Sequence, residues 1–195
     1  YKRGVSSYRL VLIGIGVGSV LNAITSYLLT RAQIFDVQRA TVWLTGSLNG
    51  RSWEHVRPVA IAMVVLVPAV LALARPLRAL QLGDDTAKGL GVAVERNKAL
   101  LILVAVALVA IATAAAGPVS FVAFVAGPIA RRLVHTPVTL VPAALVGALL
   151  LLVSDLIARR AFAPTELPVG IVTGIIGAPY LVWLLARANK IGRGG

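Results

Sequence analysis

Long apolar stretches bounded by charged residues recur along the whole chain. Four of them contain 17 to 22 uncharged residues each and lie between Arg9 and Arg31, Arg57 and Arg75, Arg132 and Asp155, and Glu166 and Arg187. A helix needs about 20 consecutive apolar residues to cross the hydrocarbon core of a bilayer. Each of these stretches therefore predicts one transmembrane helix.

A fifth stretch, Ala99 to Ala130, is too long for a single crossing. Its 32 uncharged residues would form a helix about 48 Å long, against a hydrocarbon core of about 30 Å. Gly117 and Pro118 supply a break, because proline lacks an amide donor and glycine tolerates a tight reversal. The second half is short, so Arg131 and Arg132 are expected to extend toward the membrane interface.

The distribution of basic residues predicts how these helices are oriented. Six crossings place both chain ends on one side, and the segments on that side hold 13 Lys and Arg residues against 6 on the other. Segments rich in Lys and Arg stay in the cytoplasm. The pattern therefore predicts a single all-α domain over residues 1–195, an integral membrane bundle of about six transmembrane helices with both ends cytoplasmic.

Composition agrees with a protein that is dissolved in lipid. The chain is 58% hydrophobic and only 13% charged, whereas about a quarter of the residues of soluble domains are charged. The net charge of +12 does not indicate nucleic-acid binding, because the basic residues lie between apolar stretches as membrane topology requires. The chain contains no Cys, so disulfides and thiolate metal sites are excluded.

Small residues recur at helical spacing within two of the predicted transmembrane helices. Gly14 and Gly18 lie one turn apart, Asn22 follows one turn later, and Gly170 and Gly174 repeat the spacing. Such a stripe lets neighbouring backbones approach closely. It is interpreted either as a helix-packing face or as a face that lines a translocation pathway.

The segment between Arg75 and Lys98 is too polar to lie in lipid. Asp84 and Asp85 precede Lys88, an order that suits the dipole of a short helix, which Gly89 or Gly91 can end. One interpretation is a solvated loop helix. The other is a docking helix for a cytoplasmic partner, in which small residues at every fourth position form one flat face, namely Gly83, Ala87 and Gly91.

This segment resembles the coupling region of ABC importer permeases, known as the EAA motif, in the version found in the FecCD-type family that imports iron-siderophores, haem and cobalamin. Three more stretches resemble that family in the same order, and these are Gly117 to Arg131, Asp155 to Arg159, and Glu166 to Pro179 with its Glu-x-Pro-x-Gly and Gly-x-Pro signatures. Trp43, Gly46 to Leu48 and Trp53 fit its outer loop. The resemblance covers nearly the whole chain.

The resemblance implies a transport subunit in the bacterial inner (cytoplasmic) membrane that has no ATPase site of its own. Family permeases have ten transmembrane helices, and the coupling loop follows the sixth, so the present helices are expected to be the fifth to the tenth of a longer protein. Implied partners are a second permease in a homodimer or heterodimer, two cytoplasmic ATPase subunits that bind the ATP, an extracytoplasmic substrate-binding protein and membrane lipid.

The resemblance also implies site residues. Contact with the ATPase is assigned to Leu82, Gly83, Asp84, Asp85, Ala87, Gly89, Leu90 and Gly91. Docking of the binding protein is assigned first to Arg159, whose alternative is an intrahelical pair with Asp155, and then to Arg160 and Arg51. The inner gate is assigned to Ser6 and Ser7, with a plain cytoplasmic turn as the alternative, and the small-residue stripe adds Asn22 as a candidate pathway residue.

The chain departs from the family pattern at two places. Asp84 stands where the family usually has Glu, and Gly127-Pro128 replaces a common Pro-His before Ile129-Ala130-Arg131. The first change conserves the charge, and the second favours siderophore over cobalamin as cargo.

Two other classes of protein fit the sequence less well. A secondary transporter or channel driven by an ion gradient would need ionisable groups near mid-membrane, which the long apolar stretches lack. A membrane enzyme would need a nucleophile, base or metal cluster, and none is evident in the sequence. No phosphate-binding Gly-x-x-x-x-Gly-Lys loop is present either, so no directly bound cofactor and no metal site are expected.

Overall fold

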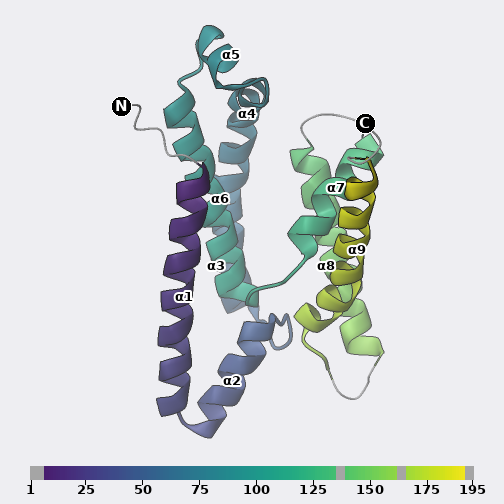
Figure 1. Ribbon diagram of the computed structural model, residues 1–195. Helices are drawn as coiled ribbons and strands as arrows, with labels where there is room; N and C mark the ends of the chain where they lie inside the picture. The colour runs from purple at the N-terminus through teal and green to yellow at the C-terminus, as the bar shows by residue number, and fades with distance from the viewer. Residues whose placement is uncertain (1–6, 135–138, 162–165, 192–195) are drawn as a thin grey trace. The chain divides into compact units, whose positions relative to one another are not determined.

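The computed structural model describes residues 7–134, 139–161 and 166–191, and the regular structure within these ranges is helical (Figure 1). The helices are α1 (Ser7–Arg31), α2 (Ile34–Thr45), α3 (Trp53–Ala72), α4 (Ala74–Gln81), α5 (Asp84–Gly89), α6 (Val94–Ala116), α7 (Val122–Val134), α8 (Leu140–Arg160) and α9 (Val169–Ile191). They fall into two compact units, Tyr1–Thr41 and Val42–Gly195. The last turn of α2 belongs to the second unit.

The first unit contains α1, a helix of 25 residues that is about 38 Å long. Three of its hydroxyl side chains, including that of Thr30, are satisfied within the helix. Ser19 donates a hydrogen bond to the carbonyl of Ile15 at 2.9 Å, and Thr25 donates one to the carbonyl of Leu21 at 2.9 Å. Hydroxyls bonded in this way are compatible with lipid, where no water replaces a missing partner.

Four helices are long and apolar enough to cross a bilayer, and they are Val11–Arg31, Trp53–Ala72, Val94–Ala116 and Leu140–Arg160. The predicted break at Gly117-Pro118 is confirmed, because α6 ends at Ala116 and α7 begins at Val122. With 13 residues, α7 is about 20 Å long and is shorter than a full crossing. The predicted all-α bundle of membrane helices is thus confirmed.

The helices of the second unit pack in two groups (Figure 1). In one group α3 lies beside α6, and α4 and α5 connect their ends. In the other group α8 packs against both α7 and α9, and α7 also contacts α9. The buried apolar side chains are mostly in the second group and include Ala126, Ala130, Ala158 and Val169.

Three glycines bring separate parts of the second unit into backbone contact, and we call Gly46, Gly117 and Gly170 the glycine crossing. The amide of Gly170 donates a hydrogen bond to the carbonyl of Gly46 at 3.0 Å, and the amide of Ser47 donates one to the carbonyl of Ala116 at 2.8 Å. A Cβ atom on Gly46 would lie 2.7 Å from the carbonyl oxygen of Pro118.

Larger side chains are excluded at the other two positions of the crossing as well. A Cβ atom on Gly117 would overlap the carbonyl oxygen of Trp43, and one on Gly170 would overlap that of Thr45. The obstacle is backbone in both cases, which cannot rotate away as a side chain can. The crossing therefore holds the end of α2, the end of α6 and the start of α9 together.

We predict that Gly170→Ala destabilises the protein, whereas Gly174→Ala does not. The added methyl group at position 170 would overlap the backbone of Thr45, and overpacking of this kind costs about 1–3 kcal/mol. A Cβ atom on Gly174 would meet nothing within 4 Å, and alanine favours helix over glycine by about 1 kcal/mol. Thermal unfolding of the purified protein in detergent would measure both effects, and equal midpoints for the two variants would contradict the crossing.

Candidate functional site

The connection between α3 and α6 forms a polar corner that includes α4 and α5. Gly83 separates the two short helices and has a φ of 102°, a left-handed value that glycine adopts readily. Asp84 and Asp85 occupy the first turn of α5 and Lys88 its last turn. The short helix predicted from the order of these charges is therefore confirmed, with charges that complement its dipole.

Two ion pairs fix this corner to different degrees. The Nζ of Lys98 lies 2.5 Å from Oδ2 of Asp84, and this pair joins α5 to the first turns of α6. The Nζ of Lys88 lies 3.8 Å from Oδ1 of Asp85, which is fully exposed. Sequence reasoning missed the first pair, because 14 residues separate its partners. Only the folded corner brings them together.

The structure corrects the expectation of one flat face formed by Gly83, Ala87 and Gly91. Helix α5 covers only six residues, and Gly83 and Gly91 lie outside it with φ values of 102° and 80°. The spacing of four residues therefore does not place them on one helical face. Ala87 is fully buried, so it packs inside the corner instead of facing a partner.

Other residues of the segment do present an accessible surface. Leu82 and Leu90 flank α5 and are 65% and 63% exposed. A Cβ atom on Gly89 would meet nothing within 4 Å. Two large apolar side chains on an otherwise polar corner can enter a hollow on another protein, and the open backbone at Gly89 leaves room for close approach.

The end of α8 carries the arginines that were assigned to docking. The Nε of Arg159 donates a hydrogen bond to Oδ2 of Asp155 at 2.8 Å, so the intrahelical pair exists in this structure. The Arg159 side chain is still 39% exposed, and Arg160 beside it is exposed. The other carboxylate oxygen of Asp155, Oδ1, is buried without a partner among the described residues.

Arg51, the third arginine, is held by the loop that follows α2. Its Nε donates a hydrogen bond to the carbonyl of Ser47 at 3.3 Å. In the same loop Asn49 reaches the carbonyl of Leu167 at 3.5 Å, and the amide of Leu167 donates to the carbonyl of Ala158 at 3.3 Å. This chain of bonds connects the loop that bears Arg51 with the end of α8. We call the arginines and this loop the arginine rim.

Two of the three predicted gate or pathway residues, Ser7 and Asn22, belong to α1. Ser6 is outside the described residues, and Ser7 is the first residue of α1. Asn22 lies within the same helix. Cβ atoms on Gly14 and Gly18 of α1 would meet nothing within 4 Å, so the stripe that they form has no packing partner among the described residues of the first unit. Both interpretations of this stripe remain predictions.

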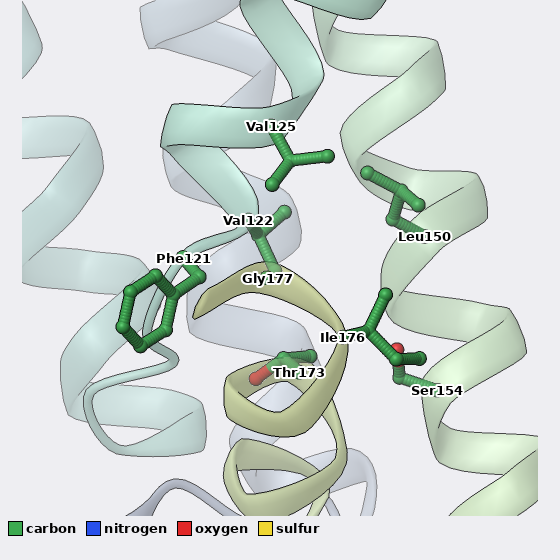
Figure 2. Close-up of a pocket in the computed structure, with 8 residues that line it drawn as sticks. All are labelled: Phe121, Val122, Val125, Leu150, Ser154, Thr173, Ile176 and Gly177. Carbon is green, nitrogen blue, oxygen red and sulfur yellow. The ribbon is translucent and has the colours of Figure 1, made fainter. Parts of the chain in front are cut away.

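A small pocket lies between α7, α8 and α9, lined by Phe121, Val122, Val125, Leu150, Ser154, Thr173, Ile176 and Gly177 (Figure 2). Its volume of about 20 Å³ is enough for one water molecule. Thr173 in its wall donates a hydrogen bond to the carbonyl of Gly170 at 3.1 Å. Drug-sized ligands need pockets of about 300–1,000 Å³, so this pocket is not a cargo site.

The polar corner and the arginine rim are separated by the length of a membrane helix. Helix α6 begins next to α5 and ends at Ala116, which is bonded to Ser47 of the rim. Its 23 residues span about 34 Å, close to the thickness of a bilayer core. The two candidate sites therefore lie at opposite ends of α6.

Helices of this length and apolarity, joined by short polar segments, define a polytopic α-helical membrane protein. The chain belongs to the FecCD transport family, which matches residues 1–187.

Known relatives are transport permeases. The chain is 46% identical over 191 residues to the ferric enterobactin transport system permease protein of Escherichia coli, covering 97% of this chain and 58% of the relative. It is 41% identical over 193 residues to the iron(3+)-hydroxamate import system permease protein of Bacillus subtilis, covering 97% and 57%. The chain thus spans somewhat more than half the length of these curated relatives.

The fold also matches a solved structure, that of a metal-chelate type ABC transporter in an inward-facing conformation. The TM-score is 0.86 at 28% sequence identity, over 93% of this chain and 60% of the other. The sequence resemblance to the family is therefore confirmed, together with the helical membrane fold.

Proposed function

We propose that this chain is the membrane-spanning part of an ABC importer permease that carries iron-siderophore-type cargo across the bacterial cytoplasmic membrane. Partner ATPase subunits supply the energy, and the chain has no ATPase site of its own. The observation that carries the proposal is the polar corner, with exposed apolar side chains flanking α5, at the opposite end of α6 from the arginine rim. Named relatives act in ferric enterobactin and iron(3+)-hydroxamate transport, which supports the class of cargo.

The polar corner is suited to contact an ATPase subunit and to be displaced by it. Leu82 and Leu90 can enter a hollow on the ATPase, while the Asp84–Lys98 pair transmits displacement of α5 to α6. A part-exposed ion pair contributes only about 0.2–1 kcal/mol of stabilisation. The backbone that joins α5 to α6 must therefore also transmit the displacement. Asp85 is fully exposed and its pair with Lys88 is long, at 3.8 Å, so its carboxylate can also contact a basic group of the partner.

At the opposite surface, the arginine rim is suited to receive acidic side chains of an extracytoplasmic binding protein. A guanidinium binds a carboxylate through two parallel hydrogen bonds. Arg159 exchanges its contact with Asp155 for the partner's carboxylate when the binding protein docks. Arg160 and Arg51 add positive charge that steers the encounter.

The remaining assignments complete the proposed assembly. Both ends of the chain face the cytoplasm, as the excess of Lys and Arg on that side supports, and the helices correspond to the fifth to the tenth of a family permease. A second permease subunit, identical or paralogous, forms the other wall of the pathway. Ser6, Ser7 and Asn22 contribute to the gate and to that wall.

Transport by reconstituted protein tests this function directly. The complete permease is placed in proteoliposomes with ferric siderophore, with and without its ATPase subunits and ATP. We expect uptake only when ATPase and ATP are both present. Uptake driven by an ion gradient alone would contradict the importer and would favour a secondary transporter or channel.

We predict that Gly89→Phe uncouples ATP hydrolysis from transport. The position is open, so a ring fits without disturbing the fold, but it would obstruct the approach of a partner. Loss of one good interface contact costs more than about 1 kcal/mol, so uptake should fall at least about fivefold while hydrolysis continues. Gly89→Ala serves as the matched control and should transport normally. Normal ATP-dependent uptake by Gly89→Phe would exclude α5 as the contact; Ala87 is unsuitable for this test because it is buried.

We predict that Arg159→Gln weakens docking of the binding protein about tenfold at low ionic strength, and less at high salt, because screening reduces interactions between exposed charges. Asp155→Asn separates docking from a purely structural ion pair, because it breaks the pair but leaves the Arg159 charge in place. This control should bind at least as well as the wild type. Equal losses of affinity in both variants, measured by surface plasmon resonance, would show that the pair has only a structural role.

A further inference from the structure

Two arginines share one tryptophan ring where α7 and α9 approach each other. The guanidinium carbon of Arg132, on α7, lies 5.1 Å from the ring centre of Trp183, and that of Arg187, on α9, lies 5.4 Å from the same point. Tyr180 packs against this indole with ring centres 5.8 Å apart. We call Arg132, Trp183 and Arg187 the arginine–tryptophan cluster.

Within the described part of the chain, the two positive charges have no acidic partner. None of the ion pairs between described residues includes Arg132 or Arg187. Both guanidinium carbons lie within 5.4 Å of the same ring centre, so two positive charges are held beside one side chain. Stacking on an aromatic face contributes about 0.5–1 kcal/mol for each cation at an exposed site. Stacking leaves the positive charge in place, whereas an anion bound by both arginines would neutralise it.

The surroundings of the cluster are apolar and exposed. Leu133 and Val134 follow Arg132 and are 67% and 44% exposed, and Val182 beside the tryptophan is 66% exposed. Trp183 itself is 44% exposed. In membrane proteins tryptophan collects where hydrocarbon meets the headgroups. Acyl chains would cover this apolar surface. A soluble protein that offered only acidic side chains would leave the surface in contact with water.

We propose that the arginine–tryptophan cluster binds the phosphate of an anionic phospholipid headgroup, with the acyl chains lying against the exposed side chains of α7 and α9. Each guanidinium donates paired hydrogen bonds to phosphate oxygens. Basic sites between transmembrane helices are suited to such headgroups. The site bridges two helices of the second group, so the bound lipid holds α7 and α9 together. This inference concerns neither cargo nor ATP and does not depend on the proposed direction of transport.

Native mass spectrometry of the complete transporter tests the proposal. The complex is taken from phosphatidylcholine bilayer discs that contain a minor fraction of phosphatidylglycerol, and the phosphatidylglycerol retained per complex is counted. The double variant Arg132→Gln, Arg187→Gln should bind phosphatidylglycerol at least about tenfold more weakly than the wild type, since a hydrogen bond to a charged group contributes enough for about a tenfold effect.

A matched control removes two positive charges elsewhere. Arg96→Gln with Arg131→Gln lowers the net charge equally at exposed positions outside the cluster, so its lipid retention should equal that of the wild type. Equal losses in both double variants would mean that only net charge matters and would overturn the site. Unchanged retention in the Arg132→Gln, Arg187→Gln variant would also overturn it.

A competitor distinguishes a lipid from a free anion. Inorganic phosphate in large excess should leave the retained phosphatidylglycerol in place, because burial of acyl chains adds affinity that a free ion lacks. Complete displacement by phosphate would show an anion site without lipid specificity and would contradict the proposal. A double variant that keeps its lipid but loses its ATPase subunits would assign the cluster to a protein contact instead.

Discussion

Lipid offers no hydrogen bonds, so every backbone amide and carbonyl within the membrane must find its partner inside the protein. Helices satisfy this requirement through their own backbone hydrogen bonds. Where α6 ends, the backbone groups need partners elsewhere in the second unit. At the glycine crossing the amide of Ser47 bonds the carbonyl of Ala116, and the amide of Gly170 bonds that of Gly46. Glycine is needed there because the backbones touch without room for a Cβ atom.

The crossing also determines which parts of the protein can act together. It fixes the end of α6 to the loop that bears Arg51 and to the start of α9, while the other end of α6 is paired to α5 through Lys98. In the proposed mechanism, a displacement of α5 would be carried along α6 to the loop that bears Arg51. This connection gives a physical route between the proposed motor contact and the proposed docking surface.

Sequence predicted those features that depend on neighbouring residues. Four of the long apolar stretches contain helices long enough to cross a membrane, Gly117-Pro118 ended α6, and the order of Asp84, Asp85 and Lys88 located α5. Periodicity failed at Gly83 and Gly91, because a helix of six residues does not extend to either glycine. The Asp84–Lys98 pair, the glycine crossing and the arginine–tryptophan cluster join distant segments, and no local pattern contains that information.

The proposed transport mechanism requires that α5 and the loop before α9 lie on opposite surfaces of the membrane, with α5 inside. The chain contains no Cys, so single cysteines can be introduced at Lys88 and at Glu166, both of which are exposed. A membrane-impermeant maleimide applied to intact cells should label Glu166→Cys at once, and Lys88→Cys only after the membrane is permeabilised. Labelling of Lys88→Cys in intact cells would contradict the account.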